Sequence, residues 1–313
     1  MSLLFYSEAD DPQPWRKAFA AGLPDLQFEV WPDVSDVNSV RYALVWNPPP
    51  GLLKQLPGLK AILSLGAGVD ALLADPTTPQ LPVIRLLDAG LAPQMAEYAI
   101  YGVLHFHREI PAYCAQQSAE QWRPLAPVLA SQWPVGVMGP GVIGGLIARH
   151  LVSLGYPVRC WSRSGKSIEG VESFAGEDSL LEFLSGCRAI VNVLPLTSQT
   201  QGILNAKLFA AMPRGSYVIN IGRGGHLVEP DLIAALDSGQ IAGALLDVFD
   251  QEPLPASHPF WSHPGVIVTP HIAGVTVASE AEAQVVANVQ RMERGEAPVG
   301  VVDRSKGYEP PGQ

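Results

Sequence analysis

The chain has 313 residues, enough for about two domains that each bury a core of their own. Its formal net charge of −10 disfavours nucleic-acid partners, because neutralising phosphates needs a basic surface. No apolar stretch is long enough for a membrane helix, and the first residues lack the pattern of a secretory signal. Cys114, Cys160 and Cys187 are widely separated, which argues against a disulfide framework or a zinc site. We therefore expect a cytoplasmic protein without membrane, nucleic-acid or metal partners.

Short apolar runs alternate with longer amphipathic ones along the chain, a pattern typical of α/β proteins. The first hundred residues predict strands at Leu3–Tyr6, Gln27–Trp31, Tyr42–Val45, Ala61–Ser64 and Val83–Leu86. A second series is predicted at Val135–Met138, Val158–Trp161, Ala189–Val193, Tyr217–Ile221, Ala244–Asp247 and Val266–Thr269. Two parallel-sheet domains fit these series better than one oversized sheet.

Two helices are expected outside this alternation. The strongly apolar segment Pro93–Ile110 separates the two series and has a proline in its first turn. Because it is so apolar, we expect it to be buried between the domains, within one subunit or against a second subunit. The segment EAEAQVVANVQRMERGE after Ser279 predicts another helix, which ends near a glycine.

The segment PVGVMGPGVIGGLIARHLVSLG places an apolar strand before the motif G-x-G-x-x-G and a helix pattern after it. In such a motif Gly139 makes the tight turn, Gly141 lets the backbone approach a pyrophosphate, and Gly144 permits close packing. The backbone amides of Val142 and Ile143 would meet the phosphates at the helix N-terminus. A glycine-rich turn also closes ordinary strand–helix joints, but this context favours a dinucleotide.

The end of the following strand indicates which dinucleotide binds. Sites for NAD usually carry Asp or Glu there to hold the ribose 2′-hydroxyl. This chain has Ser162, Arg163 and Ser164, with Lys166 just beyond. Hydroxyls and a guanidinium bind a 2′-phosphate, which a carboxylate would repel. We therefore predict NADPH/NADP in preference to NADH, with a solvated basic loop as the alternative interpretation.

Three further polar side chains follow predicted strands, where open α/β sheets bind ligands. Arg223 follows YVINIG, Glu252 lies in the loop after GALLDVF, and His271 follows VIVTP. Individually, an arginine here is usually a surface cation and a lone histidine a structural residue. Reduction of a 2-oxo acid, however, needs a cation for the carboxylate and carbonyl, a proton donor of near-neutral pKa, and a carboxylate that keeps this donor protonated. We therefore expect these three residues to form a catalytic trio.

The combination of GxGxxG, N-x-x-R-G, D-V-F-x-x-E-P-L-P and T-P-H-I-A-G resembles the D-isomer-specific 2-hydroxyacid dehydrogenase family. The stretches ALVWNPP, LGAGVD, QMAEYA, RCWSRSGKS and VVDRSKGY look like its glyoxylate/hydroxypyruvate reductase A subfamily. The likeness covers nearly the whole chain. It implies a flavodoxin-like substrate domain of residues 1–98 and 284–313, a Rossmann NADP-binding domain of residues 99–283, an active site in the cleft between them, and a homodimer.

The resemblance also implies a role for each member of the trio. His271 would protonate the carbonyl oxygen of a small anionic 2-oxo acid during hydride transfer. Glu252 would raise the pKa of His271, and Arg223 would bind and polarise the substrate.

Other matching residues receive binding roles from the same resemblance. The N–H groups of Ala67 and Gly68 would cradle the substrate carboxylate. Trp46 would cover the substrate or, equally, pack between the domains. Asp247 would hold the nicotinamide carboxamide. Five residues would line the cofactor cleft: Leu194, Pro195, Ile221, Gly222 and Gly274.

Glyoxylate, reduced to glycolate, and hydroxypyruvate, reduced to D-glycerate, are the expected substrates. Bulkier 2-oxo acids are the alternative, because a sequence does not give a pocket volume. Formate dehydrogenases of the same family carry Gln where this chain has Glu252, which argues against that activity. The remaining alternative is a non-catalytic NAD(P)-binding regulator, for which the sequence shows no peptide-binding or nuclear segment.

Overall fold

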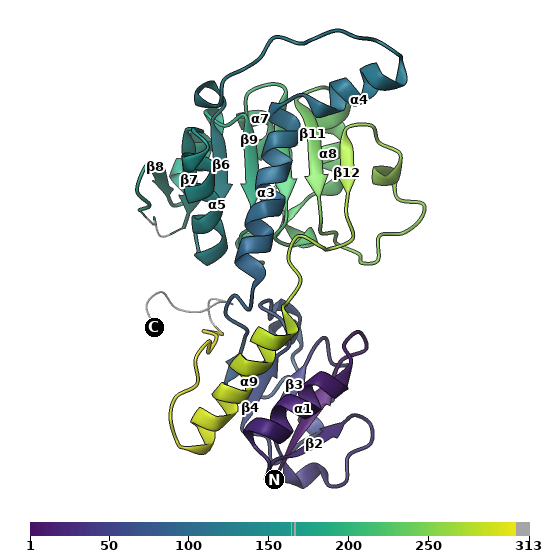
Figure 1. The fold of residues 1–313 in the computed structure, drawn as a ribbon, viewed down its shortest axis with the longest axis vertical. Coiled ribbons are helices and arrows are strands. Elements are labelled where there is room, and N and C mark those ends of the chain that lie inside the picture. The colour runs from purple at the N-terminus through teal and green to yellow at the C-terminus, as the bar shows by residue number, and fades with distance from the viewer. Residues whose placement is uncertain (164, 166, 305–313) are drawn as a thin grey trace. The chain divides into compact units, whose positions relative to one another are not determined.

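A computed structural model describes residues 1–163, 165 and 167–304, which form two compact units (Figure 1). One unit consists of residues 1–90 and 276–313, and the other of residues 91–275. The boundaries predicted from the sequence, after residues 98 and 283, lie eight residues further along the chain than the observed ones. They fall inside helices α3 (Leu91–His107) and α9 (Ala278–Glu293). The chain divides just before each helix instead, because a continuous helix packs as one piece.

The smaller unit is built on a parallel five-stranded sheet in the order β2-β1-β3-β4-β5. Its strands are β1 (Ser2–Tyr6), β2 (Gln27–Val30), β3 (Val40–Val45), β4 (Ala61–Ser64) and β5 (Val83–Ile84). This strand order is the flavodoxin-like form of the doubly wound sheet, as the resemblance implied.

Helices and turns cover both faces of this sheet. Helix α1 (Pro12–Gly22) begins where the Asp11 side chain accepts a hydrogen bond from the Gln13 amide, with a proline in the first turn. It packs with α9 on one face, and α2 (Asp70–Ala74) places Leu72 in the core on the other. Short 3₁₀ helices connect elements along the chain: Val37–Ser39, Leu53–Gln55, Ala130–Gln132, Glu177–Ser179, Gly224–His226 and Pro259–Trp261.

The larger unit is built on a parallel seven-stranded sheet in the order β12-β11-β10-β9-β6-β7-β8. Its strands are β6 (Val135–Met138), β7 (Val158–Ser162), β8 (Val171–Ala175), β9 (Ala189–Asn192), β10 (Ser216–Asn220), β11 (Ile241–Leu246) and β12 (Val266–Val268). The chain runs outward from β6 to β8 and then returns to β9 on the other side of β6. Open α/β sheets bind ligands at such a switch point, outside the carboxyl ends of the strands.

Helices form a layer on each face of this second sheet. Figure 1 shows α3 and α5 (Val142–Ser153) side by side in front of the strands. The opposite core contains side chains of α6 (Leu180–Ser185), α7 (Ala206–Ala211) and α8 (Glu229–Asp237). The sheet is therefore buried on both faces, so a ligand can reach it only at the ends of the strands.

The eleven predicted strands are confirmed to within a few residues, but β8 was missed. Its sequence VESFA buries only Phe174, so it carries little apolar signal. The predicted helix Pro93–Ile110 ends at His107, and a separate helix, α4 (Ile110–Ser118), follows. One face of α3 is buried within its own unit, whereas Tyr101 and Leu104 are exposed.

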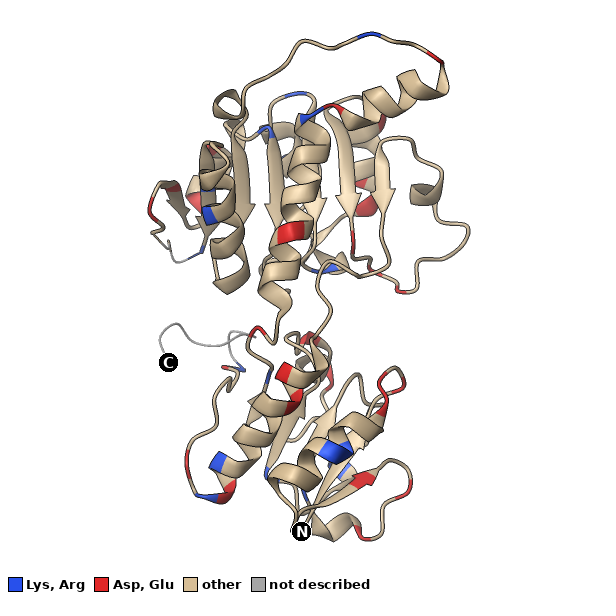
Figure 2. Ribbon diagram, viewed as in Figure 1, with Lys and Arg blue, Asp and Glu red and all other residues tan. Residues whose placement is uncertain are grey.

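Charged residues are spread over both units rather than gathered on one element (Figure 2). Any cation that meets an anionic ligand therefore acts locally and not as part of a broad basic surface. None of the helices in the described part of the chain is long and apolar enough to cross a membrane.

Candidate active site

The predicted nucleotide turn joins β6 to α5 at the switch point of the larger sheet. Gly139 has a φ of +97°, which L side chains rarely adopt. A Cβ on Gly144 would lie 2.2 Å from the carbonyl oxygen of Gly139, so the turn and helix pack closely. A Cβ on Gly141 would meet nothing within 4 Å, which leaves open space beside the turn. These are the three properties that a pyrophosphate-binding turn requires.

The first turn of α5 presents backbone amides to this space. The first hydrogen bond of the helix joins the Gly145 N–H to the Gly141 carbonyl at 2.9 Å. The preceding amides, of Val142 and Ile143, therefore have no acceptor within the helix. Val142 is also exposed. The amides and the positive end of the helix dipole suit an anionic ligand.

The end of β7 carries a hydroxyl and a guanidinium and no carboxylate. The Ser162 hydroxyl accepts a hydrogen bond from the Gly165 amide at 3.1 Å. Arg163 is exposed and donates to the Gln199 side chain in the loop after β9. Ser164 and Lys166, also expected here, lie outside the described residues. The exposed Arg163 fits a 2′-phosphate, and no acidic group at the strand end opposes it.

The other predicted cofactor residues follow β9, β10 and β12. Leu194 and Ile221 are buried in the core, so only their backbones are candidates for ligand contact, whereas Pro195 is exposed. Gly222 is buried, and Gly274 lies against α3, where a Cβ would be 2.6 Å from Met95 Cγ. Their contact with a cofactor stays a prediction.

His271 and Glu252 form a direct hydrogen-bonded pair. His271 Nδ1 lies 2.8 Å from one Glu252 oxygen, and the other oxygen accepts from the Phe249 amide at 2.9 Å. The hydrogen bond with Glu252 raises the pKa of His271 above its ordinary value, against the opposing effect of burial. Burial pushes the pKa of Glu252 upward, but the hydrogen bonds from His271 and Phe249 outweigh it and leave that pKa lowered. The geometry therefore favours a charged pair.

Asp247, at the end of β11, holds the loop that carries His271. Its carboxylate is buried and accepts hydrogen bonds from the Thr269 hydroxyl at 2.6 Å and the Ile272 and Ala273 amides at 2.8 Å. Its carbonyl accepts from the His271 amide at 2.9 Å. Three of about four lone-pair positions on the carboxylate are occupied by this loop. The sequence did not indicate this structural task, and the predicted contact of Asp247 with nicotinamide stays a prediction.

Arg223 lies in the loop after β10, beside the segment that leads to Glu252. A Cβ on Gly224 would lie 1.8 Å from the Phe249 backbone, so only glycine permits this approach. The Arg223 charge lowers the pKa of both Glu252 and His271 as a smaller effect. The structure therefore brings the three predicted catalytic residues into one electrostatic group.

Buried polar side chains that the sequence analysis did not single out lie behind Arg223. Asn192, Asn220 and His226 are nearly or fully inaccessible to solvent, and the Asn192 side chain hydrogen-bonds to both Asn220 and His226. A polar residue that ends an otherwise apolar strand, as in AIVN and SYVIN, was the signal available for the two asparagines.

The predicted substrate residues of the smaller unit lie at the carboxyl ends of β3 and β4. The Trp46 ring packs on the loop after β4, where a Cβ on Gly66 would be 2.4 Å from it. Within the described part of the chain, the Ala67 and Gly68 amides donate to no protein acceptor. These amides are therefore available to an anionic group.

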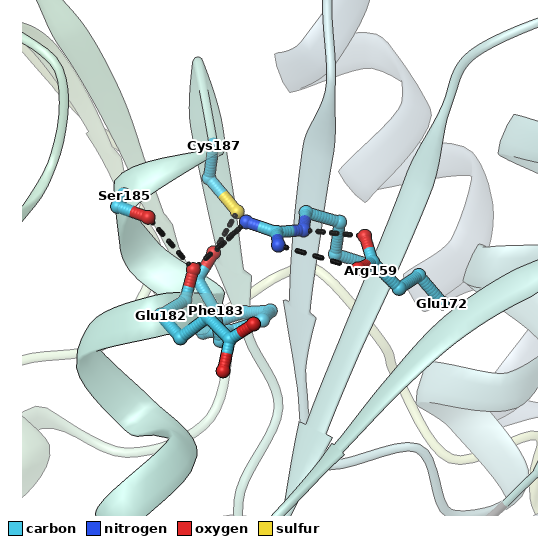
Figure 3. Close-up of polar contacts among 6 residues, drawn as sticks. All are labelled: Arg159, Glu172, Glu182, Phe183, Ser185 and Cys187. Carbon is cyan, nitrogen blue, oxygen red and sulfur yellow. Dashed lines mark hydrogen bonds and ion pairs between the residues drawn. The ribbon is translucent and has the colours of Figure 1, made fainter.

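A hollow of about 480 Å³ lies elsewhere, at the amino ends of β6 and β7. Its cation, Arg159, forms an ion pair with Glu172 at 2.8 Å and donates to the Glu182 and Phe183 carbonyls at the end of α6 (Figure 3). Because the guanidinium is neutralised and engaged, this hollow does not offer an anion site. The predicted catalytic residues lie at the opposite ends of the strands.

Comparison with known proteins places the chain among dehydrogenases. Residues 100–273 match the family model described as D-isomer specific 2-hydroxyacid dehydrogenase, NAD binding domain. The chain is 45% identical to a glyoxylate/hydroxypyruvate reductase A from Yersinia enterocolitica, with 98% of this chain and all of that protein covered.

Solved structures give the same result. A D-isomer specific 2-hydroxyacid dehydrogenase from Xanthobacter autotrophicus Py2, in complex with NADPH and MES, is 42% identical with a TM-score of 0.93. An NADPH-dependent glyoxylate/hydroxypyruvate reductase from Sinorhizobium meliloti, in complex with NADP and sulfate, is 37% identical with a TM-score of 0.90. Each comparison covers 98% of this chain and 99% of the other. The chain therefore belongs to the D-isomer specific 2-hydroxyacid dehydrogenase family.

Proposed function

We propose that this protein is an NADPH-dependent reductase of small 2-oxo acids that converts glyoxylate to glycolate and hydroxypyruvate to D-glycerate. The observation that carries the proposal is the 2.8 Å pair of His271 and Glu252, which shares an electrostatic group with Arg223. The similar proteins named glyoxylate/hydroxypyruvate reductase, and the similar structures that contain NADPH or NADP, support it.

The residues at the switch point fit the proposed cofactor. The open space at Gly141 and the amides of Val142 and Ile143 would receive the pyrophosphate. Arg163 would meet the 2′-phosphate, with Ser162 and Ser164 as hydroxyl donors. Bound NADPH supplies the hydride that reduces the carbonyl carbon.

The trio divides the remaining chemistry. Arg223 would pair with the substrate and draw electron density toward the carbonyl oxygen, where negative charge develops. Because His271 Nδ1 faces Glu252, the proton that reaches the carbonyl oxygen would come from Nε2. Glu252 would keep the imidazole oriented and charged until this transfer, and Nδ1–H would remain bonded to Glu252 afterwards.

Residues of the smaller unit would hold the rest of the substrate. The Ala67 and Gly68 amides would bind its carboxylate, and Trp46, fixed against the same loop, would limit its size. Of the remaining residues, Asp247 would accept the nicotinamide amide through its fourth lone-pair position. Backbone and side-chain contacts with the cofactor would come from Leu194, Pro195, Ile221, Gly222 and Gly274.

The protein would act as a homodimer in the cytoplasm. Exposed apolar side chains of the larger unit support the dimer: Tyr101 and Leu104 of α3, and Trp122 and Leu129 of the segment after α4. Trp122 is 97% exposed, which is unusual for a large aromatic side chain outside an interface. The three cysteines are free, as suits a reducing compartment.

The proposal is tested by NADPH oxidation, followed at 340 nm, with glyoxylate, hydroxypyruvate, pyruvate and phenylpyruvate. We expect the highest kcat/KM with the two small substrates and with NADPH over NADH. Preference for phenylpyruvate would contradict the small-substrate assignment, and equal use of NADH would contradict the cofactor assignment. Turnover of none of the four acids would overturn the proposed reaction.

A further inference from the structure

Two side chains hold the backbone of Arg223. Its N–H donates to His226 Nδ1 at 3.1 Å, and its carbonyl accepts from Asn220 Nδ2 at 3.1 Å and from the His226 amide at 3.3 Å. The Arg223 guanidinium also turns back, and Nη1 donates to the Gly222 carbonyl at 2.8 Å. Gly222 is held in turn, because its amide donates to Asn220 Oδ1 at 3.3 Å. The position of the Arg223 guanidinium therefore depends on the buried side chains of Asn220 and His226, which hold the backbone of Gly222 and Arg223.

The orientation of each group in this set is fixed by backbone atoms. The Leu194 amide donates to Asn192 Oδ1 at 3.3 Å, so the other side-chain atom of Asn192 is the NH₂ group. That group donates to Asn220 Oδ1 at 2.9 Å and to His226 Nδ1 at 3.0 Å. Two donors, one of them the Arg223 backbone N–H, thus converge on His226 Nδ1. Nδ1 is consequently an unprotonated acceptor, and the imidazole carries its proton on Nε2.

Arg223 and His226 form a capping box at the start of a short helix. The short 3₁₀ helix Gly224–His226 begins after Arg223, and its third residue reaches back to the N–H of the residue before the helix. Glu or Gln usually performs this task. Here the task falls to a histidine that is fully buried, so removal of the acceptor would take this partner from the Arg223 N–H in a partly buried position.

We propose that His226 is a positioning residue for substrate reduction, whose Nδ1 holds Arg223 in the geometry that binds and polarises the 2-oxo acid. This proposal rests on the proposed function, since it assigns Arg223 to the substrate. His226 is fully buried, so it acts on the substrate through the Arg223 backbone and not by direct contact. Asn192 and Asn220 complete the support by orienting the imidazole and by holding the Gly222 and Arg223 backbone.

Two substitutions distinguish the effect of the hydrogen-bond acceptor from the effect of side-chain packing. His226→Asn places an amide oxygen near the position of Nδ1, whereas His226→Leu fills the same volume without an acceptor. We expect His226→Leu to lower kcat/KM for glyoxylate by about 10- to 100-fold, because displacement of a catalytic group by about 1 Å costs on the order of 100-fold. His226→Asn should stay within about threefold of the unmodified protein. The Kd for NADPH, measured by fluorescence, should change by less than about twofold in both.

A double-mutant cycle tests whether the effect passes through Arg223. In an Arg223→Ala background, His226→Leu should cause little further loss, because the group that it positions is gone. Should His226→Leu not fold, His226→Gln replaces it, since its longer side chain keeps a polar group but carries the acceptor away from the Arg223 N–H.

Three results would overturn the proposal. They are unchanged kcat/KM in His226→Leu or, in its place, His226→Gln; equal loss in His226→Asn and the acceptor-free variant; or a full additional loss in the Arg223→Ala background. Absence of glyoxylate turnover by the unmodified protein would instead overturn the proposed function, and with it this assignment.

Discussion

At the scale of single residues, the proposed acid, His271, has an unfavourable backbone conformation. His271 has a φ of +55°, a left-handed conformation that costs a non-glycine residue on the order of 1–3 kcal/mol. The hydrogen bonds from the loop to Asp247 offset this cost and hold the imidazole against Glu252. The orientation of the acid therefore depends on a carboxylate that is buried beneath it.

The chemistry of the reaction predicted part of this site and not the rest. Arg223, Glu252 and His271 were identified because a carbonyl reduction requires their side-chain types and because their motifs resemble a family. Asn192 and His226 were not: a polar strand end marks Asn192 in the sequence, but its hydrogen bond with His226, 34 residues further along the chain, forms only after folding. Such a buried polar pair has no local pattern in a sequence.

Cofactor choice is predicted to depend on the charge at residue 163. Arg163→Asp should weaken NADPH binding at least tenfold more than NADH binding, because the new carboxylate would face the 2′-phosphate. The measurement is Kd for each cofactor by fluorescence titration, with Arg149→Asp, a basic residue late in α5, as a charge-matched control. An equal increase in Kd for NADPH and NADH would show that Arg163 does not interact with the 2′-phosphate.

At the scale of elements, periodicity predicted strands well where both faces are buried. Strands β6 (VGVM) and β9 (AIVN) are buried along their whole length and are apolar except for Asn192 at the end of β9, and their predicted positions are confirmed to within a residue. Strand β8 lies at the edge of the sheet with polar residues on both sides, and it was missed. Helix α4 was missed as well, because its sequence IPAYCAQQS buries only Gln116 and so shows little apolar periodicity.

The edge of the larger sheet is predicted to depend on Arg159. This residue binds two carbonyls at the end of α6 and stacks over the Phe174 ring of β8 at 4.4 Å, so it ties a helix to an edge strand. Arg159→Met should lower the free energy of unfolding by about 1–3 kcal/mol, because it removes the charged hydrogen bonds to the Glu182 and Phe183 carbonyls. Glu172→Gln should cost less, because that side chain is 60% exposed. Urea unfolding of the variants checks this ranking, and a reversed order would contradict it.

At the scale of the whole molecule, two doubly wound sheets of different strand order share one chain. The sequence predicted two parallel sheets, but pairing order is a long-range property that spacing alone does not reveal. The resemblance implied it, and the orders now observed agree with a flavodoxin-like and a Rossmann sheet. The boundaries between the two units lie just before α3 and α9, and the sequence motifs did not indicate where these helices begin.

The exposed apolar surface on and after α3 is predicted to be the dimer interface. Light scattering should give about 67 kDa, twice the chain mass of 33.4 kDa, for the unmodified protein. Trp122→Asp combined with Leu129→Asp should shift the mass toward the monomer, because charges would be buried at the interface. Leu181→Asp on α6, also at an exposed leucine, is the control. A monomeric unmodified protein, or a double variant that remains dimeric, would contradict the assignment.

The most direct test of the proposed chemistry is the pH dependence of kcat/KM for glyoxylate reduction, in the unmodified protein and in Glu252→Gln. Reduction needs the protonated imidazole, so kcat/KM should be constant at low pH and fall as the pH rises through the pKa of His271, which Glu252 holds above 6.5. Glu252→Gln removes the charge that raises this pKa, so the decline should move to lower pH. Declines at the same pH in both proteins, or a kcat/KM that rises with pH, would contradict the assignment of His271 and Glu252 as the acid and its partner.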